Sequence, residues 1–219
     1  VRLDFSISTC LQFNLIRQYE TKFLGVILSD NLTWNKHIEV VLNKTSKNVG
    51  IICKVRHLLP RHLTRVLYLT LVEPYINYCN LIWALPEKTE LLDRVLKVQK
   101  KYCRILTFSG FVAHSAPLFS ELNILTVYNI YKYQLGNYMY KILKNHLPSL
   151  DHHSFMFNSQ IHDHDTRQKD DLHTEFCRTK GRQNTIIYQG CKLWNDLSDE
   201  LKSASSYNIF KKRFRLTLK

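Results

Sequence analysis

The most informative part of the chain reads Lys22-Phe23-Leu24-Gly25-Val26-Ile27-Leu28, followed by Leu32-Thr33-Trp34 and His37-Ile38. The apolar, β-branched run is typical of a buried strand, and its single glycine predicts a bulge or a close backbone approach. We expect this strand to pair with residues 11–19 in a hairpin that turns at Glu20-Thr21. From Trp34 onward the hydrophobic period becomes helical, so a strand, a tight turn and a long helix follow one another.

The rest of the chain has mainly helical periodicity. Apolar residues recur at steps of three and four over residues 34–58, 61–72, 88–107 and 125–147, which predicts amphipathic helices. Shorter helices are expected from Pro74, over 117–122, up to Trp194 and from Tyr207. The predicted fold class is mainly α, a helical bundle with a small N-terminal β-hairpin and a short β element near residues 173–188.

The composition favours a polyanionic partner. The 219 residues carry a formal net charge of +13, which suits nucleic acid or an anionic membrane surface. No apolar run approaches the roughly 20 residues that span a bilayer, so we expect no membrane-embedded segment. The six cysteines are widely spaced and form no Cys-x-x-Cys pair, which predicts reduced thiols in an intracellular protein. We interpret the start at Val1 as a truncation.

Two stripes of basic residues are the candidate nucleic-acid contacts. At about 100° per residue, the first stripe lies opposite the apolar face of helix 34–58 or near its edge, and Trp34 beside it is a candidate for stacking on bases. The second stripe shares one face of helix 88–107. We expect both stripes to face a common groove and to bind phosphates, although solvated outer helix faces would show the same pattern. The stripes consist of Lys36, Lys44, Lys47 and Lys54, and of Arg94, Lys97, Lys101 and Arg104.

No self-contained active site or metal site is predicted. The histidine-rich segment with His152, His153, His162 and His164, and Cys177 beyond it, has ligand-type residues whose spacing fits no closed zinc pattern. An exposed polar loop is the alternative. Asp170-Asp171 lacks the Tyr-x-Asp-Asp motif and the flanking apolar strand that are typical of a polymerase carboxylate pair.

Several segments resemble reverse transcriptases of non-LTR retrotransposons of the jockey-like and CR1-like kind. They are Phe23-Leu24-Gly25-Val26, Leu32-Thr33-Trp34-Asn35-Lys36-His37-Ile38, Leu67 to Tyr78, Leu96 to Gln99 with Arg104, His164 to Arg167, and Gly190 to Leu197. Ser198 departs from the proline that the family usually has there. The resemblance implies the end of the palm, the thumb and the tail of an RNA-directed DNA polymerase.

The resemblance also implies partners and roles. The hairpin at Phe23, Leu24 and Gly25 would help to hold the primer end, and the helices would lie against an RNA–DNA or RNA template–primer duplex. The family's catalytic aspartates lie upstream, in the palm and fingers region that this chain lacks. The chain alone would therefore be inactive and would need no cofactor, whereas the full-length enzyme would use magnesium.

This interpretation divides the chain into four segments. Residues 1–33 would form the end-of-palm hairpin, 34–147 a thumb-like helical domain, 148–172 a polar histidine-rich linker, and 173–219 a C-terminal tail. The alternative function is a non-enzymatic helical module that docks on a partner protein and uses its basic faces for solubility.

Overall fold

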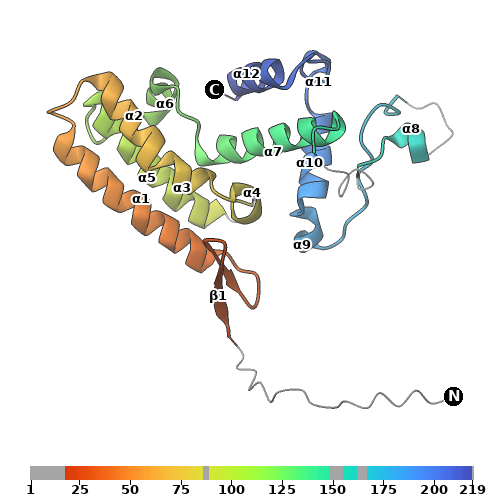
Figure 1. Cartoon of the computed structure of the whole chain (residues 1–219), viewed down its shortest axis with the longest axis horizontal. Coiled ribbons are helices and arrows are strands. Elements are labelled where there is room, and N and C mark those ends of the chain that lie inside the picture. The colour runs from red at the N-terminus through yellow and green to blue at the C-terminus, as the bar shows by residue number, and fades with distance from the viewer. Residues whose placement is uncertain (1–17, 86–88, 148–154, 162–166, 219) are drawn as a thin grey trace.

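The computed structural model describes residues 18–85, 89–147, 155–161 and 167–218. Helices dominate it, and a two-stranded antiparallel hairpin projects from one end (Figure 1). The predicted fold class is therefore confirmed. None of the helices in the described ranges is long and apolar enough to cross a bilayer.

The hairpin turns at a different place from the one predicted. β1 (Glu20–Phe23) pairs with β2 (Val26–Ser29), and the Phe23–Val26 pair closes a two-residue turn at Leu24-Gly25. Both turn residues have positive φ, 45° and 84°, as the tight hairpin turns that match strand twist require. The predicted turn at Glu20-Thr21 is wrong because those residues lie inside β1. Residues 11–17, the predicted partner strand, lie outside the described residues.

The first core is built by helices that the sequence predicted. α1 (Asn35–Val55) packs directly against α5 (Thr89–Thr107), with α2 (Arg61–Leu71), α3 (Glu73–Asn77) and α4 (Asn80–Trp83) completing the layer (Figure 1). Pro60 immediately precedes α2, and Pro74 lies in the first turn of α3, where its missing N–H costs nothing. Ile38, Ile52 and Trp83 are fully buried at the centre.

Gln99 connects three helices inside this core. Its side chain is fully buried, and its amide nitrogen donates to the Tyr68 hydroxyl at 2.9 Å and to the Leu125 carbonyl at 3.1 Å. Its amide oxygen accepts from the Val127 N–H at 2.8 Å. These hydrogen bonds join α5 to α2 and to the start of α7 (Val127–Leu143). In the chain, α6 (Ser115–Leu122) lies between α5 and α7.

A second core covers the other half of α7. α10 (Ile186–Asn195) and α12 (Tyr207–Thr217) both pack on it. The contacts are close because two glycines leave room: a β-carbon on Gly136 would lie 2.3 Å from the Phe214 ring, and one on Gly190 would lie 2.5 Å from the Met139 sulfur. The predicted tail is thus packed on the last helix of the predicted thumb-like domain.

The segment around the predicted linker differs from expectation. Phe155 and Leu172 are buried in the second core, Phe157 and Leu172 form an isolated antiparallel bridge, and α8 (Asn158–Ile161) lies between them. No β element lies at 173–188, all of which is described. α9 (Lys180–Gln183) and the start of α10 occupy it instead, and α11 (Asp199–Lys202) follows α10. Thr185, in a β-branched run, accepts from the Tyr188 N–H and so starts a helix.

Candidate nucleic-acid interface

A cavity of about 430 Å³ lies where the hairpin turn meets α1, α2 and α3. We call it the hairpin groove. Gly25 comes from the hairpin turn, His37 and Lys44 from α1, and Tyr75 and Tyr78 from α3 and its C-cap. The remaining lining residues are Val40, Val41, Thr70, Leu71 and Pro74. Three segments that are distant in the sequence therefore meet in one place.

Tyr78 fixes the hairpin turn against the helices. Its hydroxyl donates to the carbonyl oxygen of Leu24, and a β-carbon on Gly25 would touch the Tyr78 ring at 3.5 Å. A side chain is disfavoured at Gly25 by its φ of 84°, whereas the contact with the ring would be an ordinary van der Waals contact. The glycine thus lets the turn approach α3, although by a tight turn rather than by the bulge in a strand that the sequence suggested.

The tip of the hairpin exposes large apolar side chains. Phe23 is 62% exposed and Leu24 is 73% exposed. Leu24 also has φ of 45°, a conformation that is uncommon for a side chain of this size. The three residues predicted to hold a primer end therefore lie together at an accessible turn next to the groove.

Lys44 supplies the positive charge of the groove. Its ammonium lies 5.2 Å from the centre of the Tyr75 ring, within the range of a cation–π contact. One turn further along α1, the Asn48 side chain donates to the Leu71 carbonyl and ties α1 to the end of α2. The groove thus combines an accessible cation with two partly exposed tyrosine rings.

His37 is a groove residue that sequence analysis did not select. It is 4% exposed, and its Nδ1 accepts from the Ile27 N–H at 3.4 Å. The neutral ring therefore carries its proton on Nε2, which is buried without a hydrogen-bond partner among the described residues. Burial, and secondarily the charge of Lys44, lowers the His37 pKa below 6.5. The ring is accordingly neutral at physiological pH.

The two basic stripes do not share the hairpin groove. Of their eight residues, only Lys44 lines it. Lys36, Lys47 and Lys54 are exposed on the side of α1 opposite its buried face. Because α5 packs on that buried face, these lysines point away from α5. The expectation of one groove between the stripes is therefore not met.

On α5 the second stripe is mostly accessible. Arg94, Lys97 and Lys101 are exposed. Arg104 is partly buried, and its Nε donates to the Ala113 carbonyl at 3.0 Å, which holds the loop before α6. Arg104 thus has a structural contact, whereas Arg94, Lys97 and Lys101 form no hydrogen bond or ion pair with any described residue.

Trp34 is placed differently from the prediction. Its ring is 8% exposed and belongs to the first core. A base cannot stack on it without removing it from that core. The ring packs at the junction between hairpin and α1 because the chain enters the helix there.

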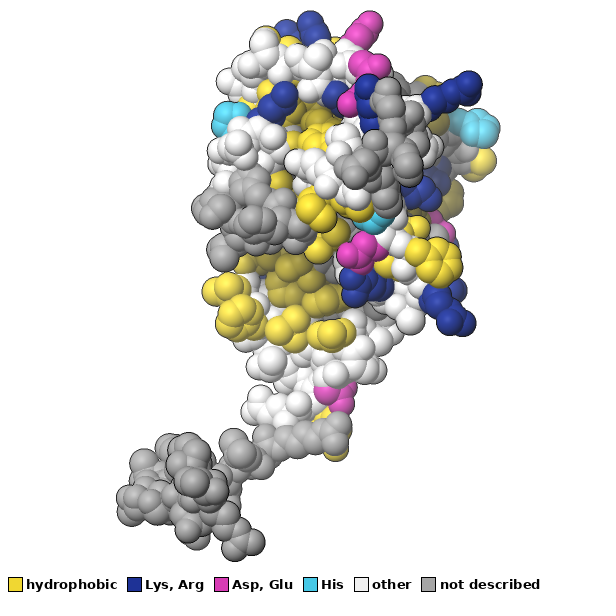
Figure 2. Space-filling model, turned by 90° about the vertical axis from the view of Figure 1, so that its right-hand side faces the viewer, with side chains coloured by type: hydrophobic (Ala, Val, Ile, Leu, Met, Phe, Trp, Pro, Cys, Tyr) yellow, Lys and Arg dark blue, Asp and Glu magenta, His cyan; other side chains and the backbone are white. Residues whose placement is uncertain are grey.

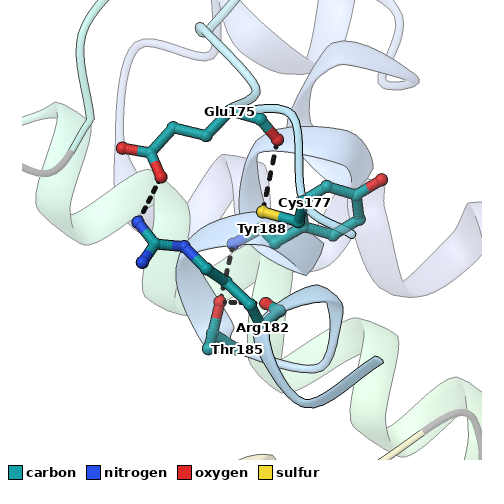
Figure 3. Close-up of polar contacts among 5 residues, drawn as sticks. All are labelled: Glu175, Cys177, Arg182, Thr185 and Tyr188. Atoms are coloured by element: carbon teal, nitrogen blue, oxygen red, sulfur yellow. Dashed lines mark hydrogen bonds and ion pairs between the residues drawn. The ribbon is translucent and has the colours of Figure 1, made fainter. Parts of the chain in front are cut away.

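A second cavity, of about 470 Å³, lies in the C-terminal half. Glu175 pairs with Arg182 across its edge, and the Cys177 thiol contacts the Glu175 carbonyl at 3.4 Å (Figure 3). Thr185 bonds both the Arg182 carbonyl and the Tyr188 N–H, which closes the turn between α9 and α10 (Figure 3). These are local contacts that hold a loop on two helices. They do not form a catalytic arrangement.

The described residues hold no cluster of three or more metal-ligating side chains. His152, His153, His162 and His164 lie outside the described residues. Burial raises the pKa of the Cys191 thiol, beside the second cavity, to about 11, so that thiol is not a ready metal ligand or nucleophile.

Comparison with protein-family models, with characterised proteins and with solved structures finds no match to this chain.

The residues that sequence analysis missed are His37, Tyr75 and Tyr78. All three lie within the segments on which the family resemblance is based. Their signal was therefore present in the sequence, but only the folded chain brings them to one groove.

Proposed function

We propose that this chain is the thumb and tail portion of a non-LTR retrotransposon reverse transcriptase and that it binds the template–primer duplex without catalysing synthesis. The observation that carries this proposal is the convergence at the hairpin groove. The segments containing Gly25, His37, and Tyr75 with Tyr78 were each selected for their family resemblance, and they line one cavity. Convergence of such segments favours a shared role over three separate structural roles.

The chemistry of the groove and its surroundings suits a nucleic-acid strand. Lys44 offers a cation to a phosphate, and the exposed rings of Tyr75 and Phe23 offer apolar surface to sugars and bases. None of these groups reads a base edge in a defined pattern, so the proposed binding is sequence-independent. The exposed lysines of α1, which also carries Lys44, would extend the contact along the phosphate backbone, whereas the exposed cations of α5 face a different side and would contact a separate stretch of it.

The test measures the affinity of the whole chain for an RNA–DNA heteroduplex with a recessed primer end. Fluorescence anisotropy reports the affinity at each concentration of a salt series. Lys47→Glu with Lys101→Glu should weaken binding and lower the salt slope by about one for each lysine that contacts phosphate. Arg178→Glu with Lys180→Glu is the matched control, since both residues are exposed and lie outside the stripes. Equal affinity of the stripe variant and the control would refute the stripe contact.

A protein-interaction module is the second candidate, and a specific observation favours it. Around the α1–α2 connection, Ile51, Leu58, Leu63 and Val66 are 40–80% exposed. Figure 2 shows that apolar side chains also gather on the face directly above the hairpin. Exposed apolar surface of this kind suits a protein partner. Self-association that is insensitive to salt, together with no nucleic-acid binding, would select this function in sedimentation experiments.

A further inference from the structure

α7 and α12 form an antiparallel pair with no acidic residue in either helix. Near one end Tyr207 lies by Tyr140, and Phe214 lies further along, against Gly136. α7 contributes two basic residues and α12 contributes four: Lys132, Lys141, Lys211, Lys212, Arg213 and Arg215. The helix pair itself therefore carries six cations and no carboxylate, and the nearby carboxylates of Asp199 and Glu200 come from α11, which packs on α12.

Two of these cations come together at one aromatic ring. The Lys141 ammonium lies 4.7 Å from the centre of the Tyr207 ring, and the Lys211 ammonium lies 6.0 Å from it. The two ammonium groups are therefore no further apart than the sum of those distances. Neither forms an ion pair with any described residue. We call these three residues the Tyr207 cluster.

Neighbouring lysines and an arginine extend the same charge. Lys144 and His146 follow α7 and are exposed, and the His146 ring stacks on Tyr140 at 6.2 Å. Lys212 and Arg213 are exposed on α12. Arg215 is different, because it donates to the Asn123 carbonyl at 3.2 Å and lies over the Tyr133 ring. Lys144, Lys212 and Arg213 thus add accessible cations near the Tyr207 cluster, and Arg215 belongs to the packing.

The position of Lys141 in the last turn of α7 has a simple local benefit, because a cation there interacts favourably with the helix dipole. That benefit does not account for Lys211, which comes from a different helix and approaches the same ring. Two like charges beside one ring raise the local positive potential, which favours an anionic ligand there.

We infer that the Tyr207 cluster and the exposed cations around it bind the phosphate backbone of a nucleic acid. The surface is additional to the hairpin groove and does not depend on the function proposed above. Several accessible cations contributed by two helices match a polyanion rather than a single small anion. A membrane surface fits less well, because an interfacial helix buries its apolar face in lipid. The two phenylalanines of α12 are already buried, since Phe210 and Phe214 are 0% and 1% exposed, which leaves Ile209 and Leu216 as its exposed large apolar side chains.

The test compares three double variants of the whole chain. Lys141→Glu with Lys211→Glu alters the Tyr207 cluster, Lys47→Glu with Lys101→Glu alters the stripes, and Arg178→Glu with Lys180→Glu makes the same change of charge elsewhere. The probes are a 30-nucleotide single strand, an RNA–DNA heteroduplex, and vesicles of phosphatidylcholine with phosphatidylserine. Circular dichroism checks folding, and Lys141→Gln with Lys211→Gln replaces the cluster variant if that variant does not fold.

The inference predicts that the cluster variant binds nucleic acid about tenfold more weakly at 50 mM salt, with a salt slope lower by about two. The charge-matched control should change affinity less than threefold. A cluster variant that behaves like the control overturns the inference, as does wild-type binding to vesicles but not to nucleic acid. An effect of the stripe variant alone supports only the function proposed above, and an effect of the cluster variant alone supports only this inference. No nucleic-acid binding by the wild type overturns both.

Discussion

Replacing Gly136 by alanine tests how closely α7 and α12 are packed. A β-carbon at this position would lie 2.3 Å and 2.8 Å from two carbons of the Phe214 ring. The ring has little freedom to move, since it is 1% exposed and stacks on Phe210 with centroids 5.4 Å apart. Either the ring or α12 must shift to accommodate the methyl group.

Two opposing effects decide whether Gly136→Ala raises or lowers the free energy of unfolding. Alanine is about 1 kcal/mol better than glycine inside a helix, whereas an added methyl in a full core costs about 1–3 kcal/mol. Contacts this short place the cost at the upper end of that range, so Gly136→Ala should lower the free energy of unfolding by about 1–2 kcal/mol. For a chain of this length the melting temperature should fall by roughly 2–8 °C.

Two other glycines provide controls within the same chain. Gly50 lies in α1, and a β-carbon added there would have nothing within 4 Å, so Gly50→Ala should stabilise by about 0.5–1 kcal/mol. Gly190 faces the flexible end of Met139, which can move aside, so Gly190→Ala should lie between the other two. The measurement is urea unfolding followed by circular dichroism. If Gly136→Ala stabilised the chain as much as Gly50→Ala, the close packing of Phe214 on α7 would be refuted.

Two further predictions concern buried polar side chains. Gln99→Leu should lower the free energy of unfolding by about 2–4 kcal/mol, because it leaves the Tyr68 hydroxyl and two backbone groups at the start of α7 buried without partners; urea unfolding that detects a loss below 1 kcal/mol would contradict the network. For His37, the folded pKa is lower than the unfolded value of 6.5, so the unfolded chain binds the proton first. The contribution of neutral, buried His37 to the free energy of unfolding is therefore fully present above about pH 6.5. It decreases as the pH falls from there toward the folded pKa. His37→Gln should remove that part of the pH dependence, and unfolding curves of both proteins between pH 5 and 8 measure the difference; parallel curves would contradict it.

The helices could be predicted from the sequence because their signals are local. The apolar periodicity of residues 34–58 predicted both ends of α1 to within three residues. Pro60 and Pro74 indicated where the next helices, α2 and α3, begin. The hairpin turn was missed because Leu24 is a poor turn residue. Only its closure against Tyr78, 54 residues away, stabilises the positive φ. Thr185 with the two isoleucines after it has strand propensity, but packing of α10 on α7 decides in favour of a helix.

The candidate site was less predictable than the fold. The accessible lysines and arginines of the two stripes were identified from helical spacing, but their directions in space depend on how α1 packs on α5. Burial of Trp34 likewise depends on how the first core packs around the start of α1. The hairpin groove requires Gly25, Lys44 and Tyr78 to meet, and no local pattern of residues specifies that meeting.

Because α7 contributes side chains to both cores, the protein cannot be truncated after α7 without exposing part of that helix. A protein ending near residue 147 would keep α7 but lose every helix that covers Met139, Tyr140 and Ile142. Those side chains would face water, and the shortened product would tend to aggregate or be degraded. Deletion series intended to isolate the first half should therefore retain residues 155–218, or replace the bare apolar positions with polar ones.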